Sequence, residues 1–224
     1  MSSVVIVPGL AVRSFVIPAA DALAAAGHQV QLMPAPGWRG VPDRLAAYGD
    51  WLAGELAKRD EPVDVLVGLS AGTQAAAVTA AQIPVSHLLL VSPTVPPERR
   101  TRRKLFGSWL RGDQHPDSPT LAQQAPDWLR AGPRRIYRCM VSALEVPLEE
   151  VLEAVDASVT LIHAGWDNLT SFDFVNALAV EHALDVIELP AAPHSWPIGD
   201  EDRFVALVNS LTLDLSPPPT RPAP

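Results

Sequence analysis

The amino-acid sequence predicts an α/β fold, in which helices cover both faces of one mostly parallel β-sheet. Three observations support this prediction. Short runs of valine, isoleucine and leucine recur along the chain, and such runs are typical of buried parallel strands. Segments of roughly 10 to 15 residues with helical composition separate these runs. The chain has 224 residues, 48% of them hydrophobic, which suits one such domain with a full core but not two ordinary domains.

The first two predicted strands flank a helix. Residues 4–7 are an uninterrupted β-branched run, as expected of a strand buried on both faces. Residues 15–26 have helical composition, and residues 28–33 alternate in polarity as a second strand. The proline- and glycine-rich residues 34–40 form a loop. After this loop, Asp43 is predicted to cap an amphipathic helix with apolar positions at Leu45, Tyr48, Leu52 and Leu56.

The rest of the chain continues the alternation. A third strand leads into the motif Gly-x-Ser-x-Gly at residues 68–72. Three more strands are predicted at residues 85–91, 159–163 and 185–189. Helices are predicted at residues 71–82, 171–182 and 201–211. The prediction is therefore one sheet of six strands, and such sheets bind ligands at the carboxyl ends of their strands.

The alternation is interrupted once, after the fourth strand. Residues 94–156 contain short helical pieces between prolines and glycines and no convincing strand. We therefore assign residues 1–93 and 157–213 to the α/β core, and residues 94–156 to a helical insertion. The proline-rich residues 214–224 have little apolar side chain to bury and are predicted to form an extended, disordered tail.

Composition and charge exclude several classes of function. The net charge is −8, which argues against general binding of nucleic acids. No apolar run approaches the ~20 residues that span a bilayer, and Met1-Ser2-Ser3 lacks the basic start of a secretory signal. The single Cys139 cannot form an internal disulfide, so we expect a reducing, cytoplasmic compartment. The sequence has no cluster with metal-ligand spacing, and no cofactor is expected.

The most informative stretch is Gly68-Leu69-Ser70-Ala71-Gly72, which follows an apolar run and precedes an alanine-rich segment. A strand, a sharp turn and a helix are the context of a nucleophile elbow. A turn this tight brings backbone segments close together, which Gly68 and Gly72 permit because they have no Cβ. The Ser70 hydroxyl would then stand above the sheet, near free amides at the start of the next helix. The alternative is a serine that only caps that helix.

Two further polar residues follow strands in a suggestive order. Asp167 lies after the fifth predicted strand and His194 after the sixth. A serine hydroxyl is a poor nucleophile until a base removes its proton, and that base is usually a histidine oriented by a carboxylate. Alternatively, Asp167 closes a turn with Asn168, and His194 bonds to loop backbone. His163 competes as the base but is better interpreted as a packing residue. The other histidines are interpreted as surface or capping residues, namely His28, His87, His115 and His182.

The chain resembles the α/β-hydrolase superfamily over nearly its whole length, to about Leu211. The resemblance rests on the elbow and on the order Ser70, Asp167, His194. Further short motifs carry it, namely Val7-Pro8-Gly9-Leu10, Gly27-His28-Gln29-Val30, Pro36-Gly37-Trp38-Arg39-Gly40, His163-Ala164-Gly165-Trp166-Asp167 and Pro193-His194-Ser195-Trp196-Pro197. The chain is similar to compact members whose sheet begins at the family's third strand. The family's oxyanion loop commonly reads His-Gly, where this chain has Pro8-Gly9.

The resemblance implies a serine hydrolase that cleaves a carboxylic ester or thioester through an acyl-enzyme on Ser70. His194 would act as the base, and Asp167 would stabilise its protonated ring. The backbone N–H groups of Leu10 and Ala71 would hold the oxyanion. Other roles stay open, namely lactone, amide or C–C bond cleavage, acyl transfer on the same triad, or a non-hydrolytic binding or lyase function. The expected partner is a small-molecule acyl substrate.

The resemblance also implies that residues 94–156 form a lid over Ser70, which shapes the pocket and excludes water. Candidate substrate contacts are Trp38, Leu69, Trp109, Trp166 and Trp196, with further lining from Phe106, Leu110, Trp128 and Tyr137. The lid is basic and contains the run from Arg99 to Lys104. This run could attract an anionic substrate such as a phosphopantetheine thioester. It could equally be a solvated helix face balanced by acidic neighbours, and both interpretations stay open.

Overall fold

The computed structural model of the protein describes residues 1–111 and 115–213. Its centre is one six-stranded sheet with the strand order β2-β1-β3-β4-β5-β6. Every neighbouring pair of strands is parallel, which confirms the predicted fold class. The strands are β1 (Ser3–Val7), β2 (Gln29–Leu32), β3 (Val63–Leu69), β4 (Val85–Val91), β5 (Ser158–Ala164) and β6 (Asp185–Leu189).

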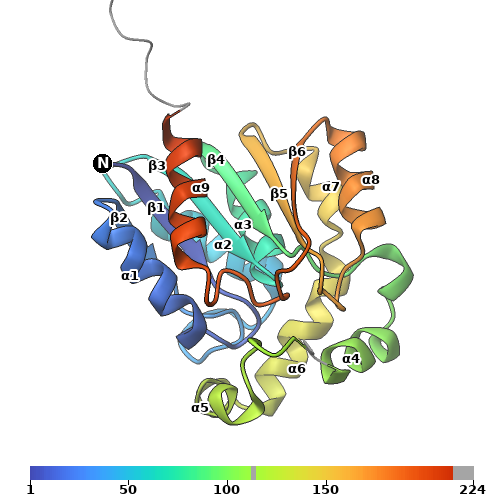
Figure 1. The fold of residues 1–224 in the computed structure, drawn as a ribbon. Coiled ribbons are helices and arrows are strands. Elements are labelled where there is room, and N and C mark those ends of the chain that lie inside the picture. Colours follow the sequence, from blue (N-terminus) through green and yellow to red (C-terminus); the bar gives the residue numbers. More distant parts are fainter. Residues whose placement is uncertain (112–114, 214–224) are drawn as a thin grey trace, which may run out of the picture.

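Helices cover both faces of the sheet (Figure 1). One face is covered by α1 (Ile17–Ala25), which follows the short 3-10 helix η1 (Ser14–Val16), and by α9 (Glu201–Leu213). The other face is covered by α2 (Leu45–Leu56), α3 (Gly72–Ala80) and α8 (Phe172–His182). The layers therefore follow the α/β pattern that the sequence predicts.

Strand side chains alternate between the two helical layers. Val4 and Ile6 of β1 pack into the cluster under α1 and α9, whereas Val5 and Val7 pack into the cluster under α2, α3 and α8. All four side chains are fully buried. Burial on both faces explains why the central strands are continuous β-branched runs in the sequence.

The residues between β4 and β5 fold as helices, and we call them the inserted segment. Most of them lie beyond the carboxyl ends of the strands (Figure 1). The segment contains η2 (Pro97–Arg99), α4 (Arg102–Arg111), α5 (Leu121–Ala131), α6 (Pro133–Ser142), η3 (Ala143–Glu145) and α7 (Leu148–Leu152). Helix α7 lies beside α3 at the edge of that helical layer.

Buried polar contacts attach the inserted segment to the core. The Asp127 carboxylate of α5 is buried and accepts the backbone N–H groups of Arg13 and Ser14, each at 2.9 Å. The amide of Gln74 in α3 donates to the carbonyl oxygen of Ala143 at 2.8 Å. Because a broken buried hydrogen bond leaves an unsatisfied polar group, these contacts hold α5 and α6 firmly over the core.

The prediction that Asp43 caps α2 is wrong. The N-cap of α2 is Arg44, and the N–H of Leu45 donates to the Ser142 hydroxyl at 2.9 Å. Asp43 instead faces the guanidinium groups of Arg135 and Arg138, at 3.7 and 3.3 Å. A residue of the inserted segment therefore supplies the cap, and this contact across a long sequence separation has no local signal.

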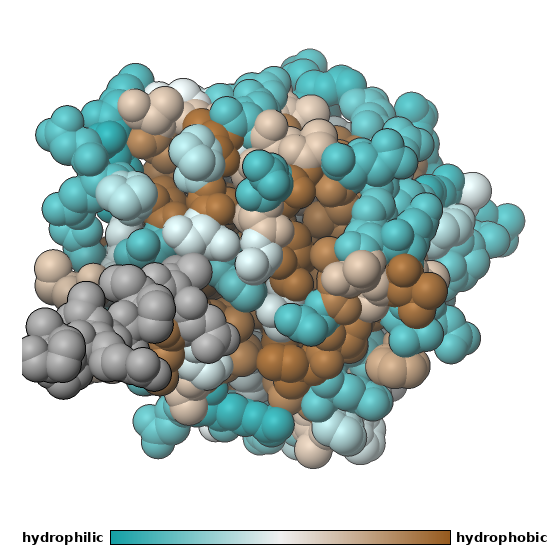
Figure 2. Space-filling model, turned by 90° about the horizontal axis from the view of Figure 1, so that it is seen from above, coloured by the Kyte–Doolittle hydropathy of each residue, from teal (hydrophilic) through white to brown (hydrophobic). Residues whose placement is uncertain are grey.

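The surface at the amino ends of the strands is mixed in character. Seen from that end, hydrophilic residues surround the rim and hydrophobic residues lie toward the centre (Figure 2). None of the helices in the described ranges is long and apolar enough to cross a membrane. The predicted disordered tail, residues 214–224, lies outside the described residues.

Candidate active site

Ser70 occupies a strained turn between β3 and α3. Its backbone φ is +53°, a left-handed conformation that costs free energy in residues other than glycine. A Cβ on Gly68 would lie 2.7 Å from both the Gly72 carbonyl oxygen and the Thr73 Cα. A Cβ on Gly72 would lie 2.5 Å from the Val7 carbonyl oxygen. Both glycines are therefore required by the close approach of backbone around Ser70, as the elbow geometry predicts.

Three side chains predicted to act together lie in one hydrogen-bonded chain. His194 Nε2 is 2.8 Å from Ser70 Oγ, and His194 Nδ1 is 2.7 Å from Asp167 Oδ2. Ser70 follows β3, Asp167 follows β5 and His194 follows β6. These strands lie in the part of the sheet from β3 to β6, and all of them are parallel, so their carboxyl ends bring the three residues to the same edge of the sheet. When the ring carries its proton on Nδ1 and donates it in a hydrogen bond to the Asp167 carboxylate, Nε2 is free of a proton and accepts the Ser70 hydroxyl.

The environment of Asp167 keeps the carboxyl group charged. Its side chain is fully buried, and Oδ1 accepts the N–H groups of Leu169 and Thr170 at 2.7 and 3.2 Å. Burial raises the pKa of Asp167. The charge and hydrogen bond of the His194 ring, together with the two backbone N–H groups, outweigh burial, so the pKa lies below its ordinary value.

The lowered pKa of Asp167 predicts a pH-dependent contribution to stability. A carboxyl group with a lower pKa in the folded chain stabilises the fold above the unfolded value of about 3.9. That contribution is lost as the pH falls through the folded pKa. We therefore expect the difference in free energy of unfolding between the wild type and Asp167→Asn to be largest above pH ~5 and to shrink in acid. Denaturant titrations across this pH range measure it.

An exposed carboxylate provides the control for this experiment. Asp202 lies on the exposed surface of α9, and Asp202→Asn is expected to change the free energy of unfolding by less than Asp167→Asn above pH ~5. If the difference between the wild type and Asp167→Asn did not shrink in acid, the ionic pairing of Asp167 with His194 would contribute nothing to the fold.

The two predicted oxyanion donors face the same cavity as Ser70. Leu10 follows β1, and Ala71 is the N-cap of α3. Their backbone N–H groups donate no hydrogen bond to any residue within the described part of the chain. Gly9 keeps the Leu10 loop close, because a Cβ there would lie 3.3 Å from the Ser70 Cβ. The two amides are thus available next to Ser70, although the sequence reads Pro8-Gly9 rather than His-Gly.

Comparison with protein-family models and with curated proteins finds no match. Solved structures match along nearly the whole chain. An esterase from Exiguobacterium antarcticum has a TM-score of 0.76 at 14% identity, over 95% of this chain and 92% of its own. A lipase-esterase related protein from Clostridium acetobutylicum has a TM-score of 0.74 at 13% identity, over 94% of each chain. An α/β hydrolase family protein from Desulfitobacterium hafniense has a TM-score of 0.70 at 17% identity, over 94% of this chain and 96% of its own.

The chain has the α/β-hydrolase fold. The resemblance predicted from the sequence is thus confirmed at the level of the fold. Within this α/β-hydrolase fold, Ser70, Asp167 and His194 follow strands in the order that the topology prescribes for nucleophile, acid and base.

A small apolar cavity of about 50 Å³ lies at Ser70, and we call it the inner cavity. The core supplies Leu10 and Ala71 to its wall, and the inserted segment supplies Leu105, Trp109 and Met140. Of the predicted substrate contacts, Trp109 alone is among these lining residues. Side chains of the inserted segment therefore lie over Ser70.

The other predicted contacts do not line the inner cavity. Leu69 is buried in the cluster under α1 and α9. Trp38 donates to the carbonyl oxygen of Ala11 at 3.1 Å. Trp166 is 54% exposed and packs edge-on against His115. Leu69 ends β3, whereas Trp38 and Trp166 lie on loops, and the direction of each side chain depends on contacts that the sequence does not reveal.

The prediction that Trp196 contacts the substrate is wrong, because its side chain is buried. The indole is 2% exposed, packs edge-on against Phe204 of α9 and donates to Asp200 at 2.9 Å. It therefore anchors the loop that carries His194 to the core rather than contacting a substrate.

One histidine prediction is also corrected. His87 is not a surface residue, since it is buried in β4 with Nε2 at 2.9 Å from the Thr160 hydroxyl. The Nε2 atom of His28 lies 2.8 Å from the Oδ1 atom of Asn209 in α9. His163 is buried and packs against Phe172, which confirms its interpretation as a packing residue.

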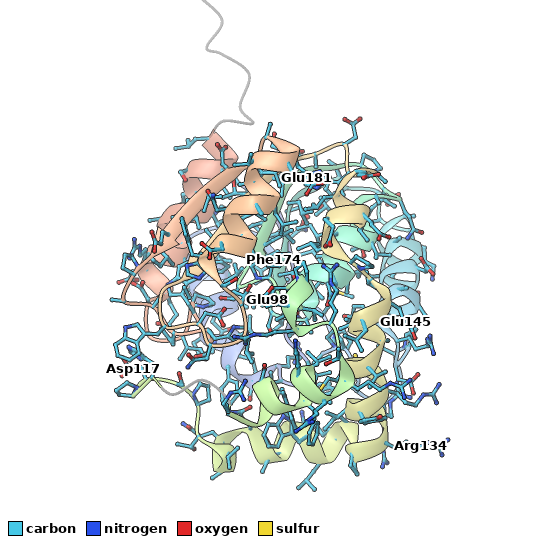
Figure 3. All side chains as sticks on the ribbon, turned by 90° about the vertical axis from the view of Figure 1, so that its right-hand side faces the viewer. Glu98, Asp117, Arg134, Glu145, Phe174 and Glu181 are labelled. Atoms are coloured by element: carbon cyan, nitrogen blue, oxygen red, sulfur yellow. The ribbon has the colours of Figure 1, made fainter. Side chains whose placement is uncertain are left out.

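The basic run divides into residues with different roles. Arg100 forms a two-pronged ion pair with Glu149. Arg99 lines the inner cavity, but its guanidinium donates to the Asn168 carbonyl oxygen and to Ser108. Arg134, farther along the inserted segment, points away from the molecule (Figure 3). Glu149 therefore balances the charge of Arg100, whereas Arg99 and Lys104 donate to the carbonyl oxygens of Asn168 and Glu98.

Sequence analysis missed several residues of the inner cavity. Thr94 lies shortly after β4, and Met140 and Leu169 complete the apolar wall. Thr94 could have been found, because it lies in the loop after a predicted strand, at the ligand-binding edge of the sheet. Met140 could not, because an apolar helical residue gives no indication of whether it faces the core or a cavity. The side chain of Leu110, another predicted lining residue, lies outside the described part of the structure.

Cys139 is the one cysteine in the sequence, and its thiol is buried in α6. Burial and the nearby charge of Asp43 raise its pKa to about 12, against the opposing charge of Arg135. The thiol is therefore neutral and unsuited to nucleophilic attack. Among the described residues, no group of three potential metal ligands lies together.

Proposed function

We propose that the protein is a serine hydrolase that cleaves a carboxylic ester or thioester of a small molecule through an acyl-enzyme on Ser70. The observation that carries this proposal is the hydrogen-bonded chain from Ser70 through His194 to Asp167, at 2.8 and 2.7 Å. Such distances permit a base to take the serine proton. The α/β-hydrolase fold, shared with esterases, supports the same reaction class.

In the first half-reaction, Ser70 Oγ attacks the acyl carbonyl carbon and its proton passes to His194 Nε2. The Asp167 carboxylate stabilises the imidazolium that forms. The carbonyl oxygen gains negative charge, and the amides of Leu10 and Ala71 stabilise it by about 3 kcal/mol each. As the bond to the leaving group breaks, His194 returns the proton to the departing alcohol or thiol.

In the second half-reaction, His194 removes a proton from water, and the resulting hydroxide attacks the acyl-enzyme. The ester bond to Ser70 Oγ breaks, Ser70 regains its proton from His194, and a carboxylic acid leaves. The inserted segment limits access of water while the acyl-enzyme exists. A cytoplasmic location is part of the proposal, since the lone Cys139 fits a reducing compartment.

Labelling with a fluorophosphonate tests whether Ser70 is activated. We expect one adduct per chain by intact mass, located on Ser70 by peptide mapping, because only a serine with a nearby base reacts readily. The variant His194→Ala is expected to lose the adduct. Labelling that survives in this variant, or that maps to another serine, would contradict the assignment of His194 as the base.

A further inference from the structure

A second and larger cavity lies within the inserted segment, and we call it the outer cavity. It has a volume of about 370 Å³, within the range of roughly 300 to 1,000 Å³ that is usual for small-molecule sites. Helices α4, α5 and α6 form its walls. Its lining is almost wholly apolar or aromatic and includes Phe106, Trp128, Leu129, Pro133, Ile136 and Tyr137.

The aromatic side chains of the outer cavity are packed but incompletely covered. Trp109 lies between Phe106 and Trp128, with ring centroids 6.0 and 5.4 Å away. Phe106 is 42% exposed, Tyr137 49% and Leu129 79%. Three large side chains exposed around one hollow form an apolar surface that would gain free energy if it were covered. An apolar ligand in the outer cavity would cover it.

The outer cavity adjoins the inner cavity at Ser70. Trp109 and Met140 line both cavities, so the inner and outer cavities share these two side chains as a common wall. The inner cavity, at about 50 Å³, has room for only a few water-sized groups. An acyl group longer than a few carbons that reacts with Ser70 must therefore extend elsewhere, and the adjoining outer cavity offers apolar space.

We propose that the outer cavity binds the apolar end of the substrate's acyl group while the carbonyl carbon lies at Ser70. The substrate class is then an ester or thioester of a medium-chain or similarly bulky apolar acid. This inference rests on the proposed function. The acyl side is assigned because the acyl group stays attached to Ser70 through both half-reactions, whereas the alcohol or thiol has to leave the site between them.

The first experiment measures kcat/KM for 4-nitrophenyl esters from acetate to decanoate. We expect a rise of about three- to fourfold for each methylene that becomes buried, until the outer cavity is filled. A series of alkyl acetates, which lengthens the alcohol instead, is expected to show no such rise. Equal rates across the acyl series, or a rise confined to the alkyl acetates, would overturn the proposal.

A pair of α5 variants locates the effect in the outer cavity. Ala125 lines the outer cavity, so Ala125→Trp fills it. This variant is expected to lower the ratio of kcat/KM for decanoate ester to that for acetate ester at least about tenfold. Ala122 is exposed on the same helix and is not among the lining residues, so Ala122→Trp is the matched control and should keep the ratio. Equal ratios in both variants would overturn the proposal.

Calorimetric titration with decanoate separates this inference from the proposed function, because it requires no turnover. Decanoate is expected to bind the wild type and Ser70→Ala alike, and Ala125→Trp at least about tenfold more weakly. If decanoate bound in this pattern but no ester were hydrolysed, the result would support apolar ligand binding in the outer cavity and would contradict the proposed hydrolase activity. If the wild type hydrolysed esters but Ala125→Trp bound decanoate as tightly as the wild type does, the outer-cavity proposal would be overturned. The proposed hydrolase activity would then still stand.

Discussion

Replacing Ser70 by alanine is expected to lower kcat/KM on an activated ester by about 10⁴- to 10⁶-fold. The reason is that the proposed reaction passes through a covalent bond to Ser70 Oγ, which no neighbouring group replaces. The variant should remain folded, because the Ser70 side chain faces the inner cavity rather than the packed core. Alanine also keeps the Cβ that lies close to Gly9. Steady-state kinetics and thermal melting of the purified variant measure both parts of this expectation.

Ser92 provides a matched control for this substitution. Like Ser70, it follows a central strand and has a positive φ, +50°. Its hydroxyl is buried and has no hydrogen-bond partner among the described residues. Ser92→Ala is therefore expected to leave ester turnover unchanged within about twofold. If Ser70→Ala kept more than a few per cent of wild-type activity, the proposed acyl-enzyme would be wrong.

Replacing Gly72 by alanine is expected to lower the free energy of unfolding by at least about 3 kcal/mol. The added Cβ would lie 2.5 Å from the Val7 carbonyl oxygen and against the carbonyl of Pro8. Both obstacles are backbone groups in or just after the central strand β1, so neither can rotate away. The elbow would have to move away from the loop that carries Leu10, and ester turnover should fall with stability. Urea denaturation gives the stability change.

Gly54 shows what the same substitution does where space is open. It lies in α2, and a Cβ there meets nothing within 4 Å. Gly54→Ala should therefore raise the free energy of unfolding by about 0.5 to 1 kcal/mol, because alanine has the higher helix propensity. Equal effects of the two substitutions would show that backbone crowding at the elbow is unimportant.

The strands were predictable because their signal is local. The runs at residues 85–91 and 185–189 coincide with β4 and β6. Strand β4 lies in a two-sided apolar environment, which selects β-branched and aliphatic residues. Strand β6 lies at the edge of the sheet and is only partly buried, and its signal is a short run that mixes polar and aliphatic residues. The elbow was predictable for a similar reason, since the approach of backbone to Ser70 excludes any Cβ at Gly68 and Gly72.

Contacts across long sequence separations were not predictable. Asp43 has the residue type and position of a helix cap, yet Ser142 supplies the hydrogen bond to Leu45. His87 precedes an apolar run in β4 and is buried beside Thr160 of the neighbouring strand. In each case the deciding partner lies in a distant segment, so its presence depends on how the segments pack.

The sequence by itself determined the α/β class, the six strands and the order in which Ser70, Asp167 and His194 follow them. These features depend on local periodicity and on sterically required glycines. Only the tertiary structure decided that Trp109 borders both cavities while Trp196 lies in the core. The physical reason is that the direction of a large side chain from a loop or an inserted helix is set by whichever distant segment packs against it. The apolar cavity between α4, α5 and α6 likewise depends on how these helices pack against one another, which the sequence does not show.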